Sequence, residues 1–177
     1  MNDLETLDAY GVLAEPNTLK IQRLLPGPME RVWAYLTESD LRRQWLAAGE
    51  MELKVGAPVE FVWRNDELNN PRGQRPAGFP EEQRMQGRIA ELDPLRKLAI
   101  AWDGFGGVSY ELERKGDDVL LTMIQRGLPN RDIILMFAAG SHMHLDILVA
   151  HLTDEQPPLF WDGWSRLQKE YGMRMAS

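Results

Sequence analysis

The sequence contains no cysteine and only three histidines. Without cysteine the chain can form no disulfide, no thiolate nucleophile and no cysteine-ligated zinc site. The glycine-rich motifs of phosphate-binding loops and dinucleotide folds are missing, and so is the GxSxG motif of the α/β-hydrolases. The sequence therefore predicts no cofactor and points to no particular reaction.

Long apolar runs and a net positive charge are also missing. No segment approaches the roughly 18 consecutive apolar residues of a membrane span, and the first residues, MNDLETLDAYG, are acidic where a signal peptide is apolar. The net charge is −7, whereas nucleic acids and anionic membranes bind basic surfaces. We therefore expect a cytoplasmic protein with no membrane span and no nucleic-acid partner.

The composition is that of one globular domain. Of the 177 residues, 44% are hydrophobic and 27% are charged, close to the averages of folded proteins. We expect an N-terminal arm over residues 1–17, one domain over residues 18–153 and a C-terminal helical extension of that domain over residues 154–177. The arm has a weak apolar pattern and can lie on the domain or on a partner, or fray.

A long helix is the strongest prediction. Residues 130–153 have helical periodicity throughout, which gives a length of about 36 Å. Asn130 is the expected N-cap residue. One face of the helix is an apolar stripe made of Ile134, Ala138, Ser141, Leu145, Leu148 and Leu152. A helix of this length can cross a whole small domain.

The chain before this helix alternates with the period of β-strands. The alternation predicts strands at Thr18–Leu25, Glu50–Lys54, Pro58–Arg64, Arg84–Leu92, Leu98–Trp102, Val108–Arg114 and Val119–Arg126. Short turns join the last four strands, so consecutive strands should pair antiparallel. Arg23 alternates with apolar residues on the first strand, where it can anchor an anion inside or form a salt bridge outside.

Two short helices and a long loop interrupt the strands. The spacing of apolar residues predicts an amphipathic helix from Met29 to Leu36, and a second helix from Asp40 to Trp45 that Ser39 can cap. Residues 65–83 form a polar loop of unusual length, which is either a surface insertion or a functional segment such as a lid. A final helix is expected over residues 159–171, with Trp161 off its apolar stripe and either exposed or in a contact.

Several local motifs resemble one protein family. The segment ERVWAYLTESDLRRQWLA (residues 30–47) follows a strand, VEFVWR comes next, and GLP precedes the long helix with its HLDILVAHL. Over residues 18–153 the chain resembles the homologues of the activator of the ninety-kilodalton heat-shock chaperone ATPase. This family belongs to the START-like, helix-grip superfamily.

The resemblance implies an α+β, helix-grip (START-like) fold. A curved antiparallel sheet of about six or seven strands should wrap around the long C-terminal helix, with two short helices at one end and an extra terminal helix. In such folds the cavity between sheet and helix usually takes a small hydrophobic or amphipathic ligand. The resemblance by itself does not imply chaperone activation, because the eukaryotic activators carry an additional chaperone-binding domain.

Aromatic residues at inward strand positions mark the expected ligand site. Trp63 and Trp102 each end an inward strand face, and aromatic walls with few polar groups build small-molecule pockets, although the same residues can simply fill a core. The expected ligand-binding residues are Trp45, Phe61, Trp63, Met85, Ile100, Trp102, Tyr110, Ser141, His142 and Leu145. Ser141, His142 and Tyr110 would supply polar specificity.

Two alternatives to ligand binding remain open at this point. His142 has Asp146 four residues further along the helix and could act as the general acid–base of a cyclase- or hydrolase-type enzyme. One histidine and one carboxylate make a weak metal site, so no metal is expected. The chain could otherwise be a protein-interaction or stress-response factor with chaperone-activator ancestry, or a homodimer, with the N-terminal arm and the final helix with Trp161 as its contact surface.

Overall fold

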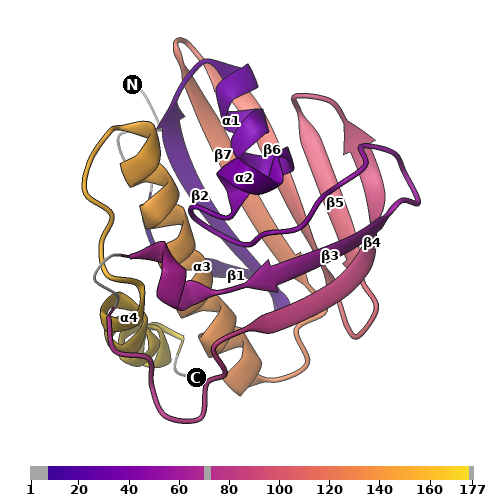
Figure 1. Ribbon diagram of the computed structural model, residues 1–177. Helices are drawn as coiled ribbons and strands as arrows, with labels where there is room; N and C mark the ends of the chain where they lie inside the picture. Colours follow the sequence, from indigo (N-terminus) through magenta and orange to yellow (C-terminus); the bar gives the residue numbers. More distant parts are fainter. Residues whose placement is uncertain (1–7, 70–72, 176–177) are drawn as a thin grey trace.

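The computed structural model describes residues 8–69 and 73–175. Figure 1 shows the strands and helices of these residues. The elements are β1 (Val12–Glu15), β2 (Thr18–Pro26), α1 (Met29–Thr37), α2 (Ser39–Arg42), β3 (Pro58–Trp63), the 3₁₀ helix η2 (Asn65–Leu68), β4 (Gln83–Asp93), β5 (Lys97–Trp102), β6 (Gly107–Lys115), β7 (Asp118–Arg126), α3 (Arg131–Leu152) and α4 (Phe160–Arg174).

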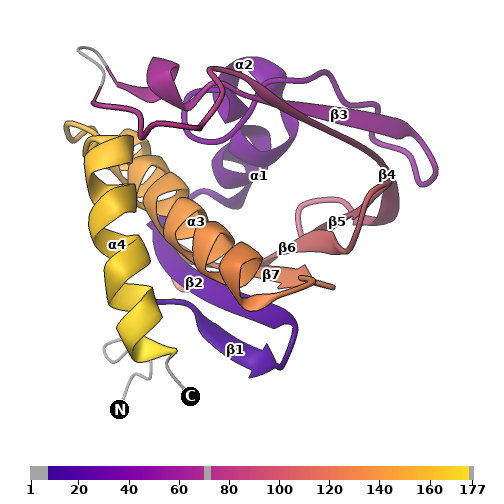
Figure 2. The same cartoon turned by 90° about the horizontal axis from the view of Figure 1, so that it is seen from below.

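The strands form one antiparallel sheet of seven strands, in the order β1-β2-β7-β6-β5-β4-β3. Strands β3 to β7 are consecutive neighbours, and β2 adds to the free edge of β7. The sheet curls around α3, which lies in its concave side (Figure 2). The prediction of an α+β helix-grip fold with a curved antiparallel sheet is therefore confirmed.

Helix α3 is the core helix of this fold. The side chain of Asn130 caps it by accepting a hydrogen bond from the Ile133 N–H at 3.0 Å. All six residues of the predicted stripe are buried: Ile134, Ala138, Ser141, Leu145, Leu148 and Leu152. They face a sheet in which buried residues recur at every second position, as in Leu19, Ile21 and Arg23 of β2.

The length and composition of α3 also fit a membrane span. Among the described residues it is the one helix that passes this test, but 61% of its most apolar 18-residue window is buried inside the structure. A core helix of a folded domain has the same property, so the helix is weak evidence for a span.

Helix α4 covers the face of α3 that points away from the sheet (Figures 1 and 2). The two helices approach closely at Gly163, where an added Cβ would lie 2.2 Å from the Met143 Sδ. Trp161, expected at the surface or in a contact, is only 4% exposed. Because α4 packs along α3, nearly every side of α3 is buried.

A buried arginine holds the end of the sheet at α2. The Arg42 side chain is 1% exposed and donates hydrogen bonds to the carbonyls of Leu36, Ala47 and Gly49. Its guanidinium lies 4.5 Å from the centre of the Phe61 ring. Burial lowers the pKa of Arg42 from 12.5 to about 10. Three main-chain carbonyls thus find their donors in one side chain.

Two local predictions are wrong. Residues 50–54 form no strand, because the segment passes the edge strand β3 with only two isolated bridges, Ala48–Val62 and Met51–Val59. The seventh strand is β1 instead, which comes from the segment predicted as an N-terminal arm and pairs with β2. Ser39 is the first residue of α2 rather than its cap, and its Oγ accepts a hydrogen bond from the Gly49 N–H.

Candidate functional site

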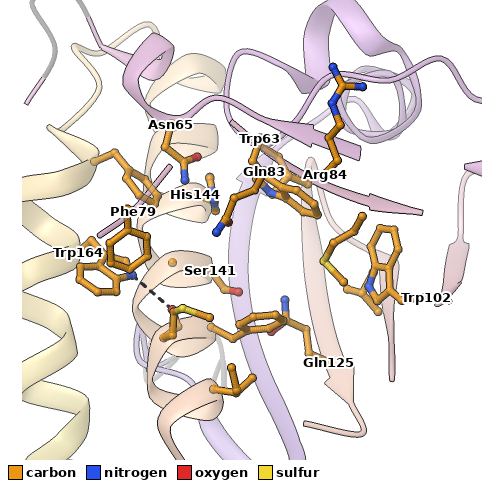
Figure 3. Close-up of a pocket in the computed structure, with 18 of the residues that line it drawn as sticks. Trp63, Asn65, Phe79, Gln83, Arg84, Trp102, Gln125, Ser141, His144 and Trp164 are labelled. Atoms are coloured by element: carbon orange, nitrogen blue, oxygen red, sulfur yellow. Dashed lines mark hydrogen bonds between the residues drawn. The ribbon is translucent and has the colours of Figure 1, made fainter. Parts of the chain in front are cut away.

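A cavity of about 400 Å³ lies between α3 and the sheet. Figure 3 shows side chains from η2, the following loop, the strands, α3 and α4 converging on it. Its lining residues are Leu46, Trp63, Asn65, Phe79, Pro80, Glu81, Gln83, Arg84, Met85, Trp102, Phe105, Val108, Tyr110, Met123, Gln125, Ile133, Met136, Phe137, Gly140, Ser141, His144, Phe160, Trp161 and Trp164. Most of these side chains are apolar or aromatic.

Two aromatic clusters form opposite walls (Figure 3). On the sheet side, Trp63 and Trp102 lie 6.1 Å apart between ring centres, and each contacts Phe61 edge to face at 5.5 and 5.3 Å. On the α4 side, Phe79 contacts Trp161 and Trp164 at 5.3 and 4.9 Å. Such contacts fix the ring orientations, so the walls have a defined shape.

His144 brings a polar ring to the cavity in a fixed tautomer. Its Nδ1 lies 2.8 Å from the Trp45 carbonyl oxygen, so the Nδ1–H donates and Nε2 is left as an acceptor. The side chain is 6% exposed, and burial lowers the pKa of His144 from 6.5 to about 4. The ring is therefore neutral at physiological pH.

Two carboxamides at the cavity have no partner for their oxygens. Asn65 begins η2, and Gln125 lies near the end of β7 on the inward-facing side. The Asn65 Oδ1 and the Gln125 Oε1 are buried and accept no hydrogen bond. Buried polar atoms without a partner are rare in folded proteins, and each calls for an explanation.

The charged side chains of the lining belong to the mouth of the cavity. The Arg84 guanidinium forms salt bridges with Glu60 and Glu82, and all three side chains are at least 37% exposed. Glu81 is 78% exposed and lies 3.8 Å from Arg75. These charges are satisfied at the surface, so the interior of the cavity is lined by neutral groups.

The 3₁₀ helix η2 and the loop that follows it are attached to α4, and the loop forms one wall of the cavity. Asp66 accepts a hydrogen bond from the Trp161 Nε1–H at 2.8 Å and pairs with Arg75. Asn69 donates to the Pro158 carbonyl and accepts from the Phe160 N–H. The position of this loop at the cavity fits a lid, and a lid role stays a prediction.

The structure brings five of the ten expected ligand-binding residues to the cavity. They are Trp63, Met85, Trp102, Tyr110 and Ser141. The other five are buried but do not line it: Trp45, Phe61, Ile100, His142 and Leu145. Trp45 fills the core beside α1, where its Nε1–H donates to the Tyr35 carbonyl. Phe61 supports the tryptophan wall from behind.

The expectation that His142 faces the cavity is wrong. Its Nδ1 lies 2.8 Å from the Tyr171 hydroxyl, which also accepts from the Gly11 N–H. Its Nε2 lies 3.4 Å from Asp146, whose other oxygen pairs with Arg23 at 2.9 Å. Arg23 thus forms an inner salt bridge with α3, and this polar cluster joins α3, α4 and β2 on the side away from the cavity.

Sequence reasoning missed most of the lining residues, and three cases show which of them had a signal in the sequence. Gln125 could have been found, because it continues the period-two series of Val119, Leu121 and Met123. His144 lies three residues after Ser141 and so on the same side of the helix. The aromatic residues of α4 and of the loop, by contrast, meet the cavity only through tertiary packing, for which no local signal exists.

Comparison with known proteins places the chain in a family. Residues 26–153 match the family model described as Activator of Hsp90 ATPase homolog 1-like protein. Among the curated proteins, no match was found.

Solved structures show the same architecture. The solution structure of the protein encoded by gene BPP1335 from Bordetella parapertussis is 31% identical, with a TM-score of 0.78 over 95% of this chain and 91% of that chain. CalU16 from Micromonospora echinospora is 19% identical, with a TM-score of 0.65 over 90% of this chain and 89% of that chain. A conserved protein of unknown function from Enterococcus faecalis, EF2215, is also 19% identical, with a TM-score of 0.66 over 97% and 94%.

The two structures at 19% identity share the fold alone. The family model spans most of the helix-grip domain, from the end of β2 to the end of α3, and the Bordetella structure covers almost the whole chain. The chain belongs to the family of Activator of Hsp90 ATPase homolog 1-like proteins.

Proposed function

We propose that the protein binds a small, mainly apolar molecule in the cavity between the sheet and α3. The observation that carries the proposal is a space of about 400 Å³ inside the domain, bounded by Trp63, Trp102, Trp161 and Trp164. Ligand pockets for small molecules are typically about 300–1,000 Å³ and are lined mostly by apolar and aromatic side chains. Both the size and the lining fit that description.

Flexible side chains support an adaptable site. Met85, Met123 and Met136 line the cavity beside the rigid aromatic walls. Methionine is unbranched and polarisable, so it can fit its shape to different apolar surfaces. The combination favours a site that accepts a class of related molecules.

The alternatives have less support. Acid–base catalysis by His142 would need its imidazole at the cavity, but that ring is bonded to Tyr171 and lies beside Asp146 on the other side of α3. A contact surface built on Trp161 would need an exposed indole, but this one is buried and donates to Asp66. Neither observation favours catalysis by His142 or a protein interface at Trp161.

A blocked cavity provides the test. Ser141 lines the cavity from α3, so Ser141→Phe should fill part of it. Ser165 is exposed on α4, so Ser165→Phe adds the same side chain outside the site. The neutral fluorescent probe N-phenyl-1-naphthylamine should bind the wild type and Ser165→Phe with the same Kd, and bind Ser141→Phe much more weakly.

The far-ultraviolet circular dichroism of both variants should match the wild type, which separates blocking from unfolding. The proposal fails if the wild type does not bind the probe, or if a folded Ser141→Phe binds it as tightly as the wild type does.

A further inference from the structure

Resting on the proposed function, we infer that the ligand is a neutral molecule whose hydrogen-bonding groups are recognised by the carboxamides of Asn65 and Gln125. A hydroxyl, ketone or amide on an otherwise apolar, flat body meets this description. A carboxylate or an ammonium group within the cavity does not. The inference names a ligand class that the apolar lining alone leaves open.

The first observation is that the two residues whose buried oxygens lack a hydrogen-bond partner both line the same cavity. Among residues 8–69 and 73–175, the buried side-chain nitrogen and oxygen atoms without a hydrogen-bond partner are the Asn65 Oδ1 and the Gln125 Oε1. Both residues line the cavity, and they come from η2 and β7, which are distant in sequence. Figure 3 shows them on different sides of the space, with Ser141 and His144 between.

The second observation is that neighbouring polar groups on the same elements are satisfied. Next to Asn65, Asp66 accepts from the Trp161 indole, and Asn69 bonds to the main chain before α4. On β7, Thr122 accepts a hydrogen bond from Gln22. The polar groups beside Asn65 and Gln125 are therefore satisfied within the protein, whereas the oxygens of these two carboxamides are left without a partner.

A carboxamide can bind a neutral partner that donates a hydrogen bond as well as one that accepts a hydrogen bond. A rotation of 180° about the last side-chain bond exchanges the oxygen and the NH₂ group, and the two orientations fill nearly the same space. Each carboxamide can therefore offer the cavity either an acceptor or a pair of donors. Hydroxyl, ketone and amide groups of a ligand match one or the other orientation.

The electrostatics of the interior exclude a charged group. The described side chains inside the cavity carry no charge: His144 is held neutral by burial, and Tyr110, 2% exposed, is also kept in its neutral form. The Arg84 guanidinium is paired with Glu60 and Glu82 outside. A ligand charge placed inside would lose its hydration without gaining a counter-charge, which is strongly unfavourable.

A matched series of probes tests the inference. The compounds 2-methylnaphthalene, 2-naphthol and 2-naphthoate share one ring system and differ in a methyl, a hydroxyl and a carboxylate. Their Kd values are measured by displacement of N-phenyl-1-naphthylamine. We expect the wild type to bind 2-naphthol about tenfold more tightly than 2-methylnaphthalene, as one ordinary hydrogen bond would provide, and to bind 2-naphthoate most weakly.

The near-isosteric substitutions Asn65→Leu and Gln125→Met, alone and together, remove the carboxamides. The double variant should bind 2-methylnaphthalene at least as tightly as the wild type and lose its preference for 2-naphthol. Its melting temperature should not fall, because two unsatisfied atoms are removed. Gln86→Met, outside the cavity on the exposed side of β4, is the control and should keep the preference.

The possible results separate this inference from the proposed function. If no naphthalene displaces the probe, or the probe itself does not bind, the proposed function fails. If the naphthalenes bind but 2-naphthol has no advantage, if 2-naphthoate binds most tightly, or if the folded double variant keeps the preference, the cavity binds ligands and the inference is overturned.

Discussion

The buried imidazole of His144 makes the stability of the protein depend on pH in a predictable way. Burial lowers the pKa of His144 from 6.5 to about 4, while its Nδ1–H donates to the Trp45 carbonyl. Below pH 6.5 the unfolded chain therefore binds a proton that the folded state resists. The contribution to stability is fully present above pH 6.5 and is lost as the pH falls toward 4.

The size of the effect follows from the two pKa values. Between pH 7.5 and pH 5, this one histidine should lower the free energy of unfolding by about 2 kcal/mol. Burial raises the pKa of Asp146, but the hydrogen bond from His142 and the charge of Arg23 outweigh it, so that pKa lies below 3.8. Its stabilisation is lost at a pH below this window, so Asp146 contributes little to the difference between the two pH values.

The assay is urea denaturation at pH 7.5 and pH 5 for the wild type and His144→Asn. An asparagine amide can still donate to the Trp45 carbonyl but does not titrate, so the variant should lose about 2 kcal/mol less on acidification than the wild type. His151→Asn, changed at a partly exposed ring that bonds to the Gln44 carbonyl, should keep the wild-type difference. Equal pH dependence in wild type and His144→Asn would refute the reasoning.

Three further changes have calculable consequences. Arg42→Met should lower the free energy of unfolding in urea by about 3 kcal/mol, because the loss of donors for three carbonyls exceeds the relief of a buried charge. Trp63→Ala should weaken N-phenyl-1-naphthylamine binding about tenfold or more, measured by fluorescence titration, while the circular dichroism stays unchanged. Gly163→Ala should cost about 1–3 kcal/mol in urea denaturation because its Cβ meets Met143, and adding Met143→Ala should cost less than the sum of the single changes.

For each of these three predictions, one result would contradict the reasoning. A wild-type midpoint for Arg42→Met would mean that water replaces the guanidinium at the carbonyls. Unchanged affinity in a folded Trp63→Ala would place the probe elsewhere. Strict additivity at Gly163 and Met143 would mean that the two side chains do not meet.

The local periodicity of the sequence was sufficient to predict most of the strands and helices of the fold. Strands with one buried face, such as Thr18–Pro26, show period-two alternation because one side meets the core and the other is partly exposed. The ends of α3 were predictable from Asn130 at its start and from Pro157 and Pro158, which follow the helix. Curvature, by contrast, followed only from the resemblance to a known fold, because no residue pattern in a single strand specifies it.

The wrong predictions concern features that tertiary contacts determine. Residues 50–54 alternate like a strand but lie beyond β3, where only isolated bridges form. On α3, His142 and His144 are similarly buried, at 5% and 6% exposure, because α4 covers the face that a lone amphipathic helix would expose. Which histidine meets the cavity depends on that packing, so the sequence pointed to His142 where the structure has His144.

The six tryptophans allow the most direct test of the cavity as a binding site. Trp63, Trp102, Trp161 and Trp164 line it, whereas Trp33 and Trp45 do not. In a ¹⁵N–¹H correlation spectrum, adding N-phenyl-1-naphthylamine should shift the indole Nε1–H signals of the four lining tryptophans and leave the other two in place. If the four signals stay fixed at saturating probe, or if only Trp33 and Trp45 move, the cavity is not the binding site.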